Sequence, residues 1–293
     1  MDRKKSSSFD KDMNDKKRTE TRALPEYKTL AARIRAHALR MTHRAGSSHV
    51  ASSLSIADLL AVLYKGILRT NPAQPQLPGR DRFILSKGHG CAAAYAVLAE
   101  CGFFPREWLD GYYLDGSHLA GHITHHGVPG VEASTGSLGH GLSISCGMAL
   151  AGKHGRQAYR VFALLSDGEC DEGSTWEAAL FAAHHHLDNL IAIVDCNRFQ
   201  AMGRTDEIIN LEPFADKWQA FGWAVREIDG HDCNQIESVL SNAPFERGKP
   251  SCVIARTVKG KGVSFMENDI AWHYRPPNDE ELRRALAELG EPE

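Results

Sequence analysis

Five short apolar runs recur along the chain between segments of helical periodicity, and this alternation constrains the fold more than any other feature. The runs are Arg82–Leu85, Val161–Leu165, Leu190–Val194, Trp223–Ile228 and Cys252–Thr257. Strands that alternate with helices favour right-handed crossovers and a parallel sheet. The sequence therefore predicts an α/β fold in which helices flank one parallel sheet.

The first 24 residues differ in composition from the rest of the chain. They contain eight Lys or Arg and five Asp or Glu, with almost nothing apolar. Such a segment buries too little surface to offset the entropy of ordering it. We therefore expect residues 1–24 to be a disordered tail and residues 25–293 to form one domain, which ends in a short helix capped by Asn278 and Glu281.

Charge and composition exclude several classes of protein. The net charge is −3, and the segment after the basic tail is more acidic still, which argues against nucleic acid as a partner. No apolar run approaches the ~20 residues of a membrane span. The seven cysteines include no CxxC pair, which favours reduced thiols in a cytoplasmic protein.

Small and polar residues follow every one of the five runs. The segments after them read SKGHG, SDGECDEG, DCNR, DGHD and KGKG. In open parallel sheets, ligands bind beyond the carboxyl ends of the strands. The sequence therefore predicts a ligand site along that edge of the sheet.

The second and third runs place two hard oxygen ligands together. Asp167 ends the second run, a capping box at Ser174–Glu177 opens a helix, and Asn197 follows the third run. A 14-residue helix after Asp167 would run back along the sheet for about 21 Å, and the six strand residues that follow would return about 20 Å. Asp167 and Asn197 should therefore meet at the same edge. A carboxylate and an amide oxygen suit Mg²⁺ or Ca²⁺, with phosphate oxygens in the remaining positions.

Two further segments contribute candidate residues. Gly136–Gly141, which includes Gly139, opens a helix, and backbone amides at a helix start attract anions. His49, His89 and His122 each lie beside Gly or Ser in a loop, where a neutral imidazole can carry protons near pH 7. A second capping box is expected at Ser55, with Asp58 three residues later.

Taken together, the motifs resemble the N-terminal, diphosphate-binding domain of the transketolase family. The resemblance covers about residues 26–285 and is closest to the separate short subunit of transketolases that are split into two chains. It rests on AGSSHVASSLS (45–55), DRFILSKGHG (81–90), GHITHHGVPGVEASTGSLGHGLS (121–143), SDGECDEGSTWEA (166–178), DCNRFQAMG (195–203) and TVKGKG…WH (257–273).

The resemblance implies a thiamine-diphosphate-binding fold and assigns roles to individual residues. Asp167, Asn197 and the backbone carbonyl of Phe199 would bind Mg²⁺, and Gly168 would let the backbone approach the diphosphate. The remaining candidates would contact the coenzyme or the sugar, or lie at a subunit interface: Gly139, His89 and Lys259 at the coenzyme, His49, His122 and His273 in the sugar channel, and Glu172 at the interface.

Four positions depart from the family pattern. Ser166 stands where Gly is usual, and His140 where Gln is usual. Val50 and Ile123 stand where the family has prolines after His49 and His122. The last three changes lie at the sugar channel, so they leave room for an unusual sugar, such as a branched or sulfonated one.

The activity implied by the resemblance is transfer of a two-carbon ketol unit from a ketose phosphate to an aldose or its phosphate. A separate C-terminal subunit would supply the pyrimidine-binding domain, in a heterotetramer or around a homodimer core. Two alternatives remain: another thiamine diphosphate enzyme subunit, of the alpha-keto acid dehydrogenase or deoxyxylulose-phosphate synthase type, and a non-catalytic coenzyme-binding or regulatory module. The histidines at 49, 89, 122 and 273 favour transketolase over the other enzymes.

Overall fold

A single five-stranded sheet organises the protein. The computed structural model describes residues 6–291, with side chains from residue 24 onward. All neighbouring strands pair in parallel, in the order β1-β2-β3-β5-β4, so the predicted α/β fold is confirmed. The strands are β1 Arg82–Leu85, β2 Val161–Ser166, β3 Leu190–Cys196, β4 Ala224–Asp229 and β5 Ser251–Arg256.

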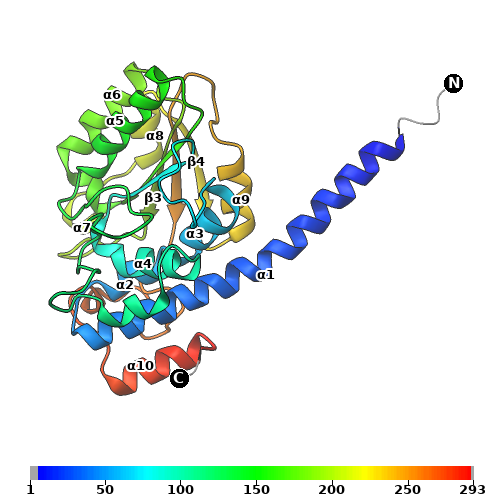
Figure 1. The fold of residues 1–293 in the computed structure, drawn as a ribbon. Helices are drawn as coiled ribbons and strands as arrows, with labels where there is room; N and C mark the ends of the chain where they lie inside the picture. The colour runs from blue at the N-terminus through cyan, green and yellow to red at the C-terminus, as the bar shows by residue number, and fades with distance from the viewer. Residues whose placement is uncertain (1–5, 292–293) are drawn as a thin grey trace.

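Helices cover both faces of this sheet (Figure 1). Helices α5, α6 and α8 lie on one side, while α3 and α9 lie on the other, beside α1 and α4. The helices are α1 Ser6–Ala45, α2 Val50–Leu54, α3 Ala57–Val62, α4 Cys91–Glu100, α5 Gly141–His154, α6 Gly173–His184, α7 Thr205–Ile208, α8 Phe214–Ala220, α9 Cys233–Ser241 and α10 Asp279–Glu288. Short helical turns span Leu63–Ile67, Gly88–Gly90, Arg106–Gly111, Gly168–Asp171 and Ile270–His273.

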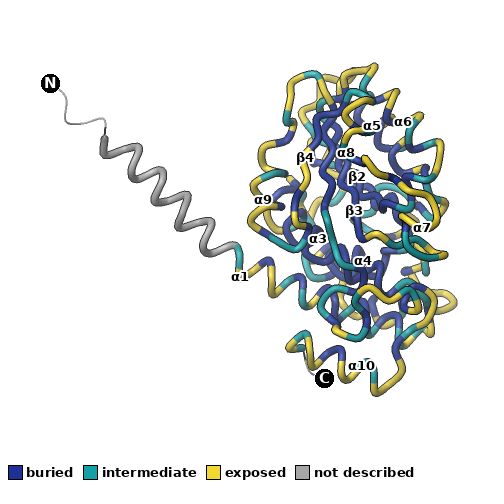
Figure 2. The backbone as a smooth tube through the Cα atoms, turned by 180° about the vertical axis from the view of Figure 1, so that it is seen from behind, coloured by how far each residue is buried: buried dark blue, intermediate teal, exposed yellow. Residues whose placement is uncertain are grey.

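Two cores sandwich the sheet because successive strand residues point to opposite faces. Along β2, Phe162 and Leu164 pack into the core beneath α1, α3 and α4, whereas Val161 and Ala163 pack into the core beneath α5 and α6. β2 and β3 are buried along their whole length, as Figure 2 shows by colour, and so is β5 except for its last residue. This burial explains why their sequences are continuous apolar runs rather than alternating ones.

The N-terminal segment is part of the first helix, and the expectation that residues 1–24 form a disordered tail stays a prediction. Helix α1 begins at Ser6, so residues 6–24 continue the helix that packs against the domain from Tyr27 onward, while residues 1–5 lie outside the described residues. Lys, Arg and Glu have good helix propensity, and extending an existing helix avoids the cost of nucleating one.

Two of the three expected capping boxes are absent. Ser55 Oγ donates to Ser52 O and to Asp195 Oδ2, and Ser174 Oγ donates to Gly139 O, so both hydroxyls serve tertiary contacts instead. The third expectation is confirmed, because Asn278 and Glu281 form a complete capping box at the start of α10. Local capping patterns are readable only where no long-range partner competes for the hydroxyl.

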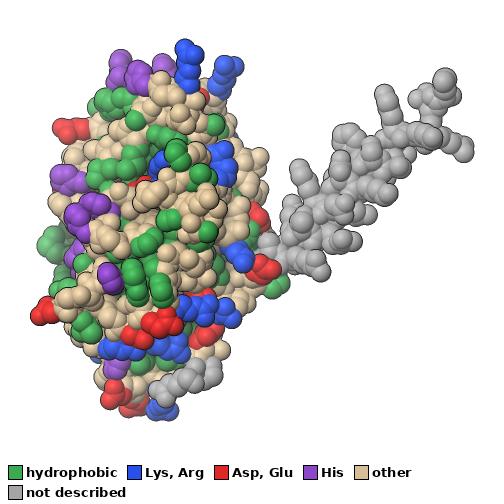
Figure 3. All heavy atoms as spheres, viewed as in Figure 1, with side chains coloured by type: hydrophobic (Ala, Val, Ile, Leu, Met, Phe, Trp, Pro, Cys, Tyr) green, Lys and Arg blue, Asp and Glu red, His purple; other side chains and the backbone are tan. Residues whose placement is uncertain are grey.

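The surface is mixed in charge. Figure 3 shows acidic and basic side chains interspersed over the lower part of one face, where α1 and α10 lie. Arg44–Asp110 and Arg275–Glu281 are ion pairs of this kind. Among residues 6–291, no helix combines the length and apolar character that crossing a membrane would require.

Candidate functional site

The register of β2 and β3 brings the two predicted metal ligands together. Ser166 pairs with Asp195, and the backbone N–H of Asp167 donates to Asp195 O at 3.2 Å. Asp167 and Asn197 therefore leave adjacent strands at the carboxyl edge, where both side chains are buried. The predicted convergence of these two residues is found in the structure.

Asp167 is held by backbone donors from both sides. Its Oδ1 accepts from Gly168 N at 2.9 Å, and its Oδ2 accepts from Arg198 N at 2.6 Å. Burial, together with the nearby Asp195 carboxylate, raises the pKa of Asp167 to about 7. A divalent cation would offset the buried negative charge, so the carboxylate fits a metal ligand.

The amide of Asn197 has a defined orientation. Its Nδ2 donates to Asp195 Oδ2 at 2.9 Å, and its Oδ1 accepts from Phe199 N at 3.0 Å. One lone pair of Oδ1 is then left for a cation, and the backbone of Phe199 lies directly beside it. Carboxylate, amide and carbonyl oxygens form the donor set that Mg²⁺ or Ca²⁺ prefers, so these residues fit such an ion.

Asp195 is a fully buried junction that the sequence analysis missed. Its Oδ2 accepts from Lys87 Nζ at 2.6 Å and from Ser55 Oγ at 2.8 Å, while Thr257 Oγ1 donates to its Oδ1. Burial alone would raise the pKa of Asp195, but the Lys87 ammonium holds it below its usual range. The junction connects the loops after β1, β3 and β5 and orients Asn197.

Gly139 reaches this edge through a second buried carboxylate. Gly139 N donates to Glu169 Oε1 at 3.0 Å, and Ser86 Oγ donates to the same oxygen. Gly139 has φ +82°, and a Cβ there would lie 2.3 Å from Ser174 Oγ, so only glycine fits. The Gly139 N–H thus has its hydrogen-bond partner within the protein, the Glu169 carboxyl. Burial raises the pKa of Glu169.

The four predicted catalytic histidines form one cluster. The ring centroid of His49 lies 5.3 Å from that of His89, 5.7 Å from that of His122 and 4.9 Å from that of His273. They come from four separate segments: the start of α2, the turn after β1, the loop before α5 and the turn Ile270–His273. A backbone hydrogen bond fixes the relative position of two of these residues, because His49 N donates to His273 O at 2.8 Å.

Three of the four rings, those of His49, His89 and His273, are held neutral by their surroundings. Burial, with help from the neighbouring histidine at 122 and Lys259, lowers the pKa of His49 to about 4. Burial and the Lys259 ammonium lower the pKa of His273 to about 3, and burial lowers that of His89 well below its usual value. Near pH 7 these rings are therefore neutral imidazoles, which both donate and accept hydrogen bonds.

Lys259 joins the histidine cluster to the carboxylates. Its Nζ lies 3.0 Å from His273 Nδ1, and its side chain is almost fully buried. Burial and the neighbouring Lys87 ammonium lower the pKa of Lys259 to about 8. Two buried ammonium groups thus lie near Asp167 and Asp195, at the edge where an anionic phosphate is expected.

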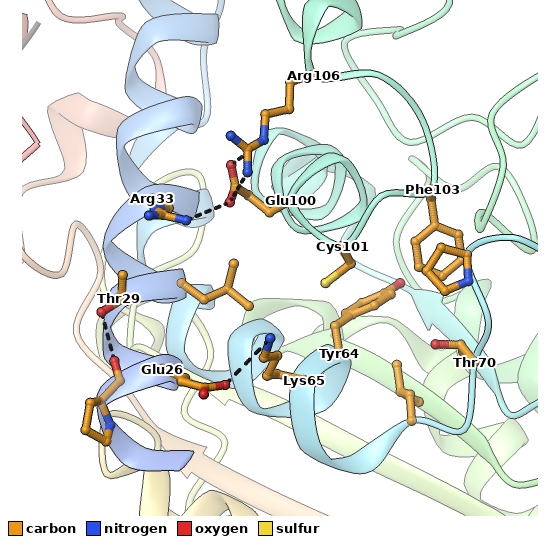
Figure 4. Close-up of a pocket in the computed structure, with 14 residues that line it drawn as sticks. Glu26, Thr29, Arg33, Tyr64, Lys65, Thr70, Glu100, Cys101, Phe103 and Arg106 are labelled. Atoms are coloured by element: carbon orange, nitrogen blue, oxygen red, sulfur yellow. Dashed lines mark hydrogen bonds and ion pairs between the residues drawn. The ribbon is translucent and has the colours of Figure 1, made fainter. Parts of the chain in front are cut away.

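A cavity of about 740 Å³ lies elsewhere, between α1, the turn after α3 and the carboxyl end of α4 (Figure 4). Figure 4 shows Arg33 and Arg106 directed at Glu100, and Lys65 at Glu26. The ten residues of α4 span about 15 Å and separate this cavity from the histidine cluster. None of the residues that line this cavity belongs to the candidate site.

Comparison with known proteins agrees with this arrangement. The family model described as "Transketolase, thiamine diphosphate binding domain" matches residues 27–292. A 6-deoxy-6-sulfo-D-fructose transketolase subunit from a Clostridium species (strain MSTE9) is 44% identical over 256 residues, which cover 87% of this chain and 93% of that protein. A subunit of the apulose-4-phosphate transketolase from Phocaeicola vulgatus is 42% identical, with 86% and 90% covered.

Solved structures give the same fold at lower identity. Transketolase from Campylobacter jejuni superposes with a TM-score of 0.87 at 30% identity, covering 92% of this chain and 43% of that one. Transketolase from Leishmania mexicana gives a TM-score of 0.86 at 30% identity, covering 91% and 41%. The chain therefore spans about two fifths of the length of these solved proteins but nearly all of the curated subunits.

Proposed function

The chain belongs to the transketolase family, whose members are transferases, and from this premise we propose that it is the diphosphate-binding subunit of a two-chain transketolase. The reaction proposed is transfer of a two-carbon ketol unit from a ketose phosphate to an aldose or aldose phosphate. Thiamine diphosphate and Mg²⁺ would be its cofactors. The observation that carries the proposal is the meeting of Asp167, Asn197 and the histidine cluster along one sheet edge.

The metal side of the site would be formed by three oxygens. Asp167 Oδ, Asn197 Oδ1 and the Phe199 carbonyl would hold Mg²⁺, which would neutralise part of the charge of the coenzyme diphosphate. Gly168 follows Asp167 without a side chain, and a Cβ there would lie 2.8 Å from Gln200 Cβ. Lys259 and His89 would face the coenzyme phosphates, whose charge matches the buried ammonium.

Proton handling would fall to the histidines. When bound, thiamine diphosphate supplies the electron sink for carbon–carbon bond cleavage and formation. The neutral rings of His49 and His273 can hold a sugar hydroxyl by donating to its oxygen or accepting its proton. His122 is exposed at the edge of the cluster, where an incoming sugar would meet it first.

A second chain would complete the enzyme. The curated relatives named as transketolase subunits match this chain nearly end to end, whereas the solved transketolases are more than twice as long as the part that matches. We propose that a C-terminal subunit with the pyrimidine-binding domain docks beside the exposed Glu172 at the start of α6. Two copies of each chain would form a heterotetramer in the cytoplasm.

The test is to assemble the chain with such a companion and to titrate thiamine diphosphate by calorimetry in excess Mg²⁺. Asp167→Ala should weaken coenzyme binding at least 100-fold and abolish ketol transfer, because one hard ligand and its charge are lost. Asp216→Ala, a matched change of an exposed aspartate on α8, should leave both unchanged. Unchanged coenzyme affinity in Asp167→Ala would sink the proposal, as would an assembled wild type that transfers no ketol unit.

A further inference from the structure

His231 lies in the segment DGHD that follows β4, and it makes two hydrogen bonds that fix its tautomer. Its Nδ1 lies 2.8 Å from Asp58 Oδ2, and its Nε2 lies 2.9 Å from Val258 N. A backbone N–H can only donate, so Nε2 must be the unprotonated nitrogen and Nδ1–H must donate to Asp58. The ring thus connects two segments that the sheet does not join.

The carboxylate behind His231 is firmly held. Arg35 Nη2 donates to Asp58 Oδ2 at 2.5 Å, and Arg35 Nε donates to Leu54 O at 3.2 Å. Arg35 and Asp58 are buried residues of α1 and α3, and these helices pack against each other in the core. The Asp58 carboxylate that accepts from His231 is therefore fixed in position, and so is the ring.

The residue that His231 binds is the neighbour of a site lysine. β5 ends at Arg256, so Val258 lies beyond the sheet. Its N–H donates to the His231 ring rather than to a neighbouring strand, and the next residue is Lys259. The lysine chain then extends through the buried interior until its Nζ lies 3.0 Å from His273 Nδ1. A shift of the backbone at Val258 would move this ammonium away from the histidine cluster.

We propose that His231 is a positioning residue: through the Val258 amide it fixes the backbone that places the Lys259 ammonium against the histidine cluster. The inference rests on the proposed function only in naming the ligand that Lys259 meets, the coenzyme phosphate. Both ring nitrogens of His231 are occupied by protein groups, so the ring serves as a spacer of fixed length between Asp58 and the loop after β5.

The two contacts can be separated by substitution. An Asn side chain reaches about as far as Nδ1, so His231→Asn keeps the donor to Asp58 and loses the acceptor for Val258. A Gln side chain reaches about as far as Nε2, so His231→Gln can keep an oxygen acceptor for Val258 N. His154→Asn, at the exposed carboxyl end of α5, is the matched control for the substitution itself.

The first measurement is amide hydrogen exchange on the purified chain. We expect His231→Asn to speed exchange of the Val258 amide at least tenfold, His231→Gln to restore protection to within about threefold of wild type, and His154→Asn to change nothing. Equal exchange at Val258 in wild type and His231→Asn overturns the proposal. Equal loss of protection in the Asn and Gln variants also overturns it, because the acceptor would then not be what matters.

The second measurement is a kinetic split on the enzyme assembled with its companion subunit. His231→Asn should raise the KM for thiamine diphosphate at least tenfold while kcat at saturating coenzyme falls by no more than about threefold, and His231→Gln should recover most of the affinity. A fall in kcat with unchanged KM contradicts a positioning role toward the phosphates. If wild type binds no coenzyme, the proposed function fails, whereas the exchange data still decide whether His231 fixes Val258.

Discussion

His49 adopts a backbone conformation that few residues accept. Its φ of 72° and ψ of 16° lie in the left-handed region at the start of α2, where Asn is among the better tolerated non-glycine residues. The same position gives its ring the central place in the histidine cluster and a pKa of about 4. Backbone strain and a shifted proton affinity therefore coincide at one residue, as they often do at functional sites.

This shift predicts how stability depends on pH. In the unfolded chain His49 has a pKa near 6.5, so between pH 6.5 and 4 the unfolded state binds the extra proton, and stability falls as pH falls through this window. His49→Asn keeps a tolerated backbone and removes the titration. Between pH 6.5 and 4, we expect the free energy of unfolding to fall by about 1–2 kcal/mol less in the variant than in wild type. This figure allows for solvent screening at a half-buried ring.

Urea unfolding at pH 7 and pH 4.5 measures this difference. His154→Asn, at an exposed position, should behave like wild type at both values. Parallel losses of stability in wild type and His49→Asn would show that this ring is not the group being titrated.

The candidate ligands could be predicted because their position is local information. Asp167 and Asn197 follow apolar runs directly, and strand ends are visible in sequence. Lys87 and Asp195 are 108 residues apart, and a lysine in a loop gives no sign that it will be fully buried. Only the sheet register reveals such a pair, since it brings the loops after β1 and β3 to one edge.

Among the elements, the loops after β1 and β3 are joined by that buried ion pair. Lys87→Met would leave the Asp195 carboxylate without its ammonium partner at a site with no exposed surface. Breaking a buried pair from one side costs about 3–5 kcal/mol, so we expect Lys87→Met to lower the free energy of unfolding by that amount. Denaturant unfolding followed by circular dichroism gives the value.

The comparison variant is Lys153→Met, which breaks the partly exposed pair between Lys153 and Asp188. Surface pairs contribute about 0–1 kcal/mol, so this variant should be nearly neutral. Similar costs for the two lysines would mean that Asp195 is satisfied by its hydroxyl and amide donors alone.

The element order followed from the sequence, but the sheet order did not. All five strands lie at the predicted runs to within two residues at either end, although Arg226 and Glu227 interrupt the apolar character of the fourth run. β5 lies between β3 and β4, and this order depends on how the strands pack together rather than on any single segment. Tertiary contacts likewise explain Ser55 and Ser174, whose hydroxyls serve distant partners instead of helix starts.

At the scale of the whole molecule, one sheet carries the entire candidate site. All five strands of the described residues belong to it, and the candidate metal ligands and the histidine cluster lie along its carboxyl edge. The solved transketolases are more than twice as long as the part that this chain matches, and the proposed companion subunit would supply the pyrimidine-binding domain.

We therefore expect a polypeptide of these 293 residues to be catalytically silent by itself. With thiamine diphosphate and Mg²⁺ in excess, we expect the isolated chain to transfer ketol units at least roughly 100-fold more slowly than the chain with its companion. The assay is product formation from a panel of ketose phosphates, with and without the companion. Robust turnover by the isolated chain would contradict the two-chain arrangement.

The donors that converge on Asp195 also limit how this sequence can drift. If Lys87 changes first, a buried carboxylate is stranded, and if Asp195 changes first, a buried ammonium is stranded beside Ser52 O. Either first step costs about 3–5 kcal/mol, which is a large part of the roughly 5–15 kcal/mol by which most proteins are stable. Substitutions at this pair are thus reachable only together, or after unrelated changes elsewhere have raised stability enough to absorb the first of them. The history of such a lineage would show long stasis at these two positions, broken by paired replacements.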